Sequence, residues 1–170
     1  MANTLVHSLL GLFGSLTSLK YGKELIVFII SLMPILEIRG GLIAASLLGL
    51  DIVPAFIICI IGNLIPIPFI LWFITPIFNW LKKTKHFKKL VDKIENKAMK
   101  KKDKIEKAEF WGLLFFVGIP VPGTGGWMGS LIASLLNMDK KKALLAATLG
   151  ILMAGFIVGT LSFGLLKAIM

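Results

Sequence analysis

The chain alternates between apolar runs and short breaks that contain proline, glycine or charge. Leu25–Met33 is very apolar and is followed by Pro34, an ionisable pair and a Gly-Gly pair, after which Leu42–Leu50 is apolar again and ends at Asp51. Each run is shorter than the roughly 20 residues that a spanning helix needs. We therefore predict a re-entrant helical hairpin with a broken tip, because non-helical backbone at membrane depth must be buried or line a wet cavity.

The apolar pattern continues beyond this hairpin. Residues 52–78 are long enough to cross a bilayer. Prolines occur in this stretch, but membrane helices tolerate proline. Apolar residues 110–117, a Gly/Pro-rich break and apolar residues 127–138 then predict a second hairpin, and 143–166 predicts a second full span. Residues 1–19 are short for a span, so we expect a short helix on the bilayer or against the other helices.

Sliding the chain on itself by 88 positions aligns the two halves. Residues 25–62 and 113–150 share 11 identities over 38 positions without a gap. Matches of proline, glycine and aspartate carry the most weight, because these residues punctuate structure. They are Pro34 with Pro122, Gly41 with Gly129, Asp51 with Asp139 and Gly62 with Gly150. We predict an all-α polytopic membrane protein, an inverted repeat of two re-entrant hairpins each followed by a full transmembrane helix.

The predicted organisation is one membrane domain with four parts. They are an N-terminal helix over 1–23, a first repeat over 24–81, a basic connector over 82–107 and a second repeat over 108–170. With 56% hydrophobic residues, 16% charged residues and a mean hydropathy of +0.88, a bilayer must surround much of the chain.

The charge distribution predicts the orientation in the membrane. The connector holds 12 lysines and 4 acids, so most of the chain's net charge of +10 lies in one segment between apolar blocks, which disfavours a nucleic-acid partner. By the positive-inside rule, this connector and Lys140–Lys142 are cytoplasmic in a plasma-membrane protein. The second hairpin then enters from the cytoplasm and the first from outside, with both tips meeting near the midplane, as in many secondary transporters.

Glu37 and Arg39 are the first candidate site residues, together with the adjacent Gly40 and Gly41. Charges at membrane depth persist when they are paired, wet or functional. Arg39 offers a fork of donors that suits phosphate or carboxylate, while Glu37 would orient the ligand or carry a proton. The alternative is an ion pair that ties the tip to a neighbouring helix.

The second tip offers backbone groups instead of charge. Its candidate residues are Pro122, Gly123, Thr124, Gly125 and Gly126. Their amides would face a ligand, and the Thr124 hydroxyl would cap the next helix or bind substrate; the alternative is a packed turn.

Other polar residues in the apolar runs carry weaker signals. Asn63 is expected to line a cavity or to bond a neighbouring helix. Asp51 and Asp139 are expected to be helix N-caps. The sequence contains no nucleophile–base pair and no metal cluster, so we expect neither an enzyme nor a cofactor.

The stretches at 34–41 and 118–127 resemble the two signature stretches of the small multi-drug export protein family. That family is similar to the DedA/VTT membrane proteins, whose opposed re-entrant hairpins are implicated in moving lipids such as polyprenyl phosphates. DedA proteins usually carry a further arginine-rich motif near the second tip, which this chain lacks.

Three functions follow as expectations. The first is translocation of an anionic lipid, such as a polyprenyl phosphate, by a homodimer in which the headgroup sits between the two tips of each chain. The second is proton-coupled export of small hydrophobic or drug-like compounds through Glu37, although a cationic substrate would not favour Arg39. The third is a non-transporting scaffold in which the ion pair is structural. Membrane lipids are the expected partners.

Overall fold

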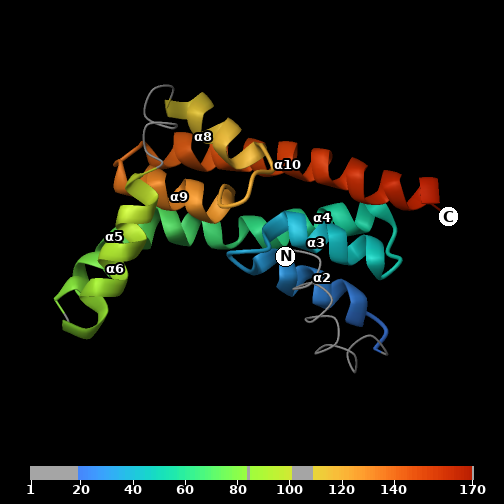
Figure 1. Ribbon diagram of the computed structural model, residues 1–170, viewed down its shortest axis with the longest axis horizontal. Coiled ribbons are helices and arrows are strands. Elements are labelled where there is room, and N and C mark those ends of the chain that lie inside the picture. The colour runs from blue at the N-terminus through green and yellow to red at the C-terminus, as the bar shows by residue number, and fades with distance from the viewer. Residues whose placement is uncertain (1–18, 84, 101–108, 170) are drawn as a thin grey trace. The chain divides into compact units, whose positions relative to one another are not determined.

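The computed structural model describes residues 19–83, 85–100 and 109–169, which form helices joined by short turns and contain no strand (Figure 1). The all-helical prediction is therefore confirmed for this part of the chain. The expected helix over residues 1–19 lies almost wholly outside it. Two compact units form: Met1–Ile65 with Ile151–Met170, and Pro66–Gly150.

The first unit contains a helical hairpin followed by a third helix. Helix α2 (Gly22–Leu32) and helix α3 (Glu37–Leu47) are its arms, and α4 (Ile52–Leu64) follows (Figure 1). The ammonium of Lys23, at the start of α2, donates a 2.9 Å hydrogen bond to the carbonyl of Leu48, just after α3. The chain therefore returns to the level at which it began, and the cation lies at the carbonyl end of α3, where it is favourable.

Small residues allow the three helices of the first unit to approach closely. A Cβ built on Gly41 of α3 would overlap the Ser31 hydroxyl and lie 2.9 Å from the Cys59 sulfur. One built on Gly62 of α4 would lie 2.9 Å from the carbonyl oxygen of Phe28 on α2. Glycine therefore lets α3 approach two small side chains at position 41 and lets α4 approach the backbone of α2 at position 62, the close packing that small residues give membrane helices.

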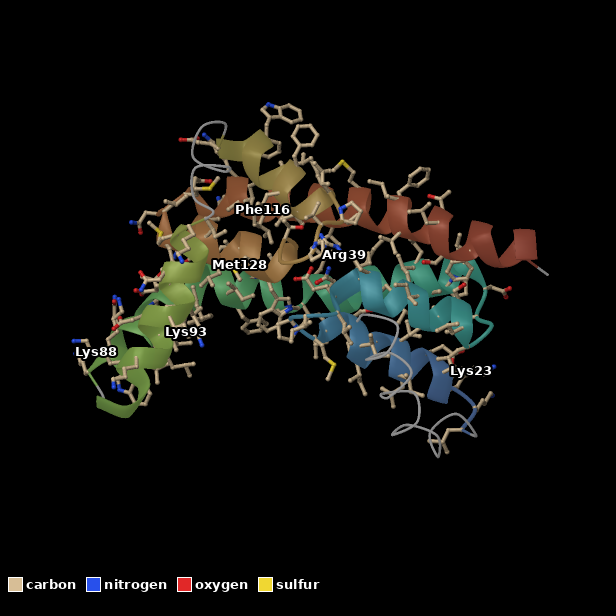
Figure 2. The ribbon with its side chains drawn as sticks, in the orientation of Figure 1. Lys23, Arg39, Lys88, Lys93, Phe116 and Met128 are labelled. Atoms are coloured by element: carbon tan, nitrogen blue, oxygen red, sulfur yellow. The ribbon has the colours of Figure 1, made fainter. Side chains whose placement is uncertain are left out.

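The second unit is built around the second hairpin. It contains α5 (Pro66–Lys82), α6 (Lys85–Met99), the hairpin arms α8 (Glu109–Gly118) and α9 (Gly126–Leu135), and the first part of α10 (Lys140–Ile169). The α5 helix packs on α9 and on α6. The predicted basic helix is observed as α6, which buries Val91 and exposes Lys88 and Lys93 (Figure 2).

The local geometry of the two units corresponds at the offset of 88. After α3, the amides of residues 48, 49 and 50 donate to the carbonyls of residues 44, 46 and 45 over 2.9, 3.2 and 3.0 Å. After α9, residues 136, 137 and 138 donate to residues 132, 134 and 133 over 2.9, 3.1 and 3.0 Å. Gly150, the counterpart of Gly62, likewise brings a built Cβ to 2.7 Å from a carbonyl oxygen of its own hairpin, that of Leu114.

The serines at equivalent positions of α3 and α9 both lie against a carbonyl of another helix. Ser46 on α3 donates to the carbonyl of Ser162 over 3.0 Å, within the first unit. Its counterpart Ser134 on α9 lies 3.4 Å from the carbonyl of Leu71, within the second. Each serine thus joins the second arm of its hairpin to another helix of the same unit, α10 in the first and α5 in the second. These correspondences support the repeat that the sequence predicts.

Two boundaries differ from the expectation. The first predicted span is divided after residue 65 into α4 and α5, and these helices fall in different units. Pro66 and Pro68 lie in the first turn of α5, where a missing N–H removes no helical hydrogen bond. The first broken tip is also shorter than expected, because helix resumes at Glu37 and includes Gly40 and Gly41.

The N-caps agree with expectation in part. Asp139 Oδ1 accepts the amide of Lys142 over 2.8 Å and so caps α10. Asp51 occupies the N-cap position of α4 without a side-chain cap bond.

Two stretches of helix are long and apolar enough to cross a membrane, Ile52–Lys82 and Lys140–Gly164. Large apolar side chains recur every fourth residue on the exposed side of the first stretch. They are Val53, Ile57 and Ile61 on α4, Ile65 after it, and Phe69, Phe73 and Ile77 on α5. Such exposed apolar rows on α4 and on α5 suit lipid and not water, which is consistent with the predicted membrane protein.

Candidate functional site

The first tip is a tight turn over residues 33–36 that ends in a strained residue. Pro34 cannot donate the hydrogen bond that would continue α2. Glu37 opens α3 with φ of +51°, a conformation uncommon for a residue with a side chain, and it is only 4% exposed. Backbone strain at a buried acid is typical of functional sites, where it costs about 1–3 kcal/mol and persists because the surroundings hold it.

Arg39 lies two residues further along α3 and is the only arginine in the chain (Figure 2). Its guanidinium is partly buried and interacts electrostatically with the Glu37 carboxylate. All other permanently cationic side chains are lysines, which lie outside the apolar runs. Arginine differs from lysine in presenting a planar fork of donors that matches phosphate or carboxylate.

Asn63 of α4 lies at about the same height in the first unit as Glu37 of α3, which follows from the way α3 and α4 pack on each other. Gly41 and Cys59 face each other on α3 and α4. Glu37 lies one turn before Gly41 and Asn63 one turn after Cys59, so antiparallel helices bring Glu37 and Asn63 to the same level. Asn63 is fully buried, and neither its amide nitrogen nor its carbonyl oxygen has a hydrogen-bond partner among the described residues. A buried, unsatisfied amide of this kind is rare and suits a ligand or water.

Gly40 and Gly41 serve the site through packing. A Cβ built on Gly40 would lie 2.6 Å from Cβ of Leu36, and one on Gly41 would overlap Ser31. Both glycines are buried within helix α3. Gly41 therefore sets how closely α3 approaches α2 and α4, Gly40 leaves room for the Leu36 side chain at the start of α3, and the amides of both belong to the helix.

The second tip, residues 119–125, is closed on itself by hydrogen bonds. Gly123 and Gly125 have φ of +79° and +128°, which favour glycine. The Thr124 hydroxyl donates to the carbonyls of Val121 and Ile119 over 2.7 and 3.1 Å. Gly125, and not Thr124, holds the N-cap position of α9.

An apolar groove of about 440 Å³ adjoins the second tip. Trp111, Phe115 and Phe116 of α8 line it together with Ile119 and Thr124 of the tip. Trp111 and Phe115 stack with ring centroids 6.2 Å apart. The sequence analysis missed this groove, although aromatic residues four apart on α8 were a signal for it.

The predicted site residues therefore divide between the two units. Glu37, Arg39, Gly40, Gly41 and Asn63 come together in the first, around the start of α3. Pro122 and Gly123, both exposed, lie with Thr124, Gly125 and Gly126 at the second tip, in the second unit. The meeting of the two tips stays a prediction.

The sequence model of the family described as "Putative small multi-drug export protein" matches residues 37–157, which is more than half of the chain. The chain belongs to this family. No curated protein and no solved structure shows significant similarity to it. The family description agrees with the apolar helices in indicating a membrane protein of an export family.

The family match begins at Glu37, directly after the turn of the first tip, and includes the whole of the second tip. It therefore contains Arg39, Asn63 and the groove next to the second tip. All candidate site residues lie within the region that the chain shares with the family, whereas α2 lies before it.

Proposed function

We propose that this protein is a membrane transporter, and not an enzyme, that moves an anionic lipid such as a polyprenyl phosphate across the plasma membrane. The observation that carries the proposal is Arg39, the chain's only arginine, on a short helix between apolar segments. The arginine would bind the phosphate, and Glu37 would hold the guanidinium in position when no substrate is bound.

Two further features support a lipid substrate. The unsatisfied amide of Asn63 lies at the level of Glu37 and offers both a donor and an acceptor to a headgroup. The groove beside the second tip is lined almost entirely by apolar groups, which suits a hydrocarbon chain. In the proposed arrangement the hairpins are re-entrant and inverted, the basic connector is cytoplasmic, and two chains form a homodimer.

The test is transport by purified protein in sealed phosphatidylcholine vesicles, with a fluorescent polyprenyl phosphate whose arrival in the opposite leaflet is measured by dithionite quenching. Arg39→Gln should lower the rate roughly tenfold or more, because charge-assisted hydrogen bonds contribute about 1.5–3 kcal/mol. Arg39→Lys keeps the charge but loses the fork and should retain only part of the activity. Asp51→Asn is the control, because it removes a charge from an exposed residue that follows α3 and lies outside the proposed site.

A second candidate is proton-coupled export of hydrophobic compounds, which the family description favours. Here the buried Glu37 would carry the proton. The same vesicles with an imposed pH gradient should then export a lipophilic dye, and Glu37→Gln should abolish the export while Arg39→Gln affects it less. If neither substrate moves and both variants fold, the pair is structural and the scaffold function gains support.

A further inference from the structure

The second unit contains a polar groove that the proposed transport site does not use. It has a volume of about 350 Å³ and lies where α5, the end of α9 and the start of α10 come together. Trp72 and Thr75 of α5, Ser134 and Asn137 at the end of α9, and Lys140 of α10 line it. The groove thus combines two hydroxyls, an amide, an ammonium and an aromatic ring.

Two of the groups that line this groove, the Thr75 hydroxyl and the Lys140 ammonium, can donate to a ligand. The Thr75 and Ser134 hydroxyls are hydrogen-bonded to each other over 2.9 Å, and either can be the donor. When Ser134 donates, the Thr75 proton is available to a ligand. No carboxylate among the described residues lies within ion-pair distance of Lys140. Its ammonium stands 5.9 Å from the centre of the Trp72 ring, which positions it beside the groove.

The first turn of α10 makes this corner electropositive. Lys140, Lys141 and Lys142 are consecutive, exposed residues at the amino end of a long helix, where the helix dipole adds partial positive charge. Asp139 is the only acid beside them in the sequence, and its carboxylate is engaged by the amide of Lys142. An anion bound in the groove would offset the excess of positive charge at this end of α10.

We propose that this groove binds the phosphate group of an anionic phospholipid. A lipid fits better than a free anion because Trp72 also belongs to the exposed apolar side of α5, beside Phe69 and Phe73. A headgroup held at Lys140 would leave its acyl chains along this aromatic surface. Tryptophan is enriched at this boundary between headgroups and hydrocarbon. The site depends on the membrane location of α5 and not on transport through Arg39.

The test measures fluorescence of Trp72 alone, in a protein with Trp80→Phe, Trp111→Phe and Trp127→Phe, in phosphatidylcholine nanodiscs. Brominated phosphatidylglycerol should quench Trp72 at a lower mole fraction than brominated phosphatidylcholine. Lys140→Gln should raise the phosphatidylglycerol fraction needed for half-quenching about fivefold. Thr75→Val, which keeps the side-chain shape, should also raise it.

The matched control is Lys141→Gln, which removes the same charge from the next residue, outside the groove lining. It should leave the quenching unchanged. Equal losses in the Lys140 and Lys141 variants would overturn the proposal in favour of a general attraction of lysines to anionic membranes. Equal quenching by the two lipids would also overturn it, and release by 10 mM inorganic phosphate would show a site for soluble anions. Transport by the variants is measured separately, so failure at Arg39 leaves this result unaffected.

Discussion

Gly49 and Asn137 occupy the same place in the two units, one residue beyond the cap of the second hairpin arm. Their φ values are +69° and +54°, and each amide donates to the carbonyl three residues earlier, Ser46 or Ser134. Glycine and asparagine are the residues that most readily end a helix in this conformation. The two units therefore have the same backbone conformation at this position although the side chains differ. A count of identical residues between the two halves does not detect this correspondence.

This equivalence predicts which substitutions the position tolerates. Gly49→Asn should change the free energy of unfolding little, and Asn137→Gly should be close to neutral. Gly49→Ala should destabilise by about 1–2 kcal/mol, because an ordinary side chain disfavours the left-handed conformation. Nothing lies within 4 Å of a Cβ at Gly49, so a steric clash would not explain the loss. The measurement is unfolding by SDS in mixed micelles, and equal effects of Ala and Asn would contradict the backbone explanation.

The sequence could predict the charged residues of the site but not their backbone. Glu37 and Arg39 are conspicuous in an apolar stretch, and Pro34 announces the turn. The positive φ of Glu37 and the helical conformation of Gly40 and Gly41 depend on tertiary packing, because local propensity alone places a Gly-Gly pair outside a helix. At the residue scale, identity was predictable and conformation was not.

At the scale of elements, two close contacts between helices place a glycine against a backbone carbonyl. Gly62 of α4 meets the carbonyl of Phe28, and Gly150 of α10 meets the carbonyl of Leu114. The sequence predicts both glycines as a matched pair at the offset of 88. It does not show which face of each long helix meets the hairpin, because apolar residues surround these helices and lipid is as apolar as a protein core.

Alanine substitutions test these contacts. Gly62→Ala and Gly150→Ala should each destabilise by about 1–3 kcal/mol, because the nearest atom is a backbone oxygen that cannot rotate away. Gly159→Ala is the matched control, since its built Cβ has its nearest neighbours at 3.9 Å. Thermal unfolding in detergent, followed by circular dichroism, compares the three variants. A loss for Gly159→Ala as large as that for Gly62→Ala would show that helix propensity or lipid contact, and not close packing, decides the outcome.

At the scale of the whole molecule, the length of the hairpin arms and the position of Lys23 bear on whether the first hairpin crosses the membrane or returns to the side from which it entered. Each hairpin arm has 10 or 11 residues, about half the length that crosses a bilayer core. The bond from Lys23 to Leu48 brings both ends of the first hairpin to one level. A hairpin that returns in this way puts residues 20 and 51 on the same side of the membrane, whereas one continuous span would separate them.

Cysteine labelling in intact cells distinguishes these topologies. In a Cys59→Ala background, which removes the only native cysteine, Lys20→Cys and Asp51→Cys should both react with a membrane-impermeant maleimide added outside. Asp139→Cys, the counterpart of position 51, should react only after lysis, because inverted repeats place equivalent residues on opposite sides. Lys93→Cys on the exposed face of α6 reports the cytoplasmic side by the positive-inside rule. Labelling of positions 51 and 139 from the same side would rule out an inverted repeat. Labelling of positions 20 and 51 from opposite sides would rule out a re-entrant first hairpin, because its two ends would then lie on different sides of the membrane.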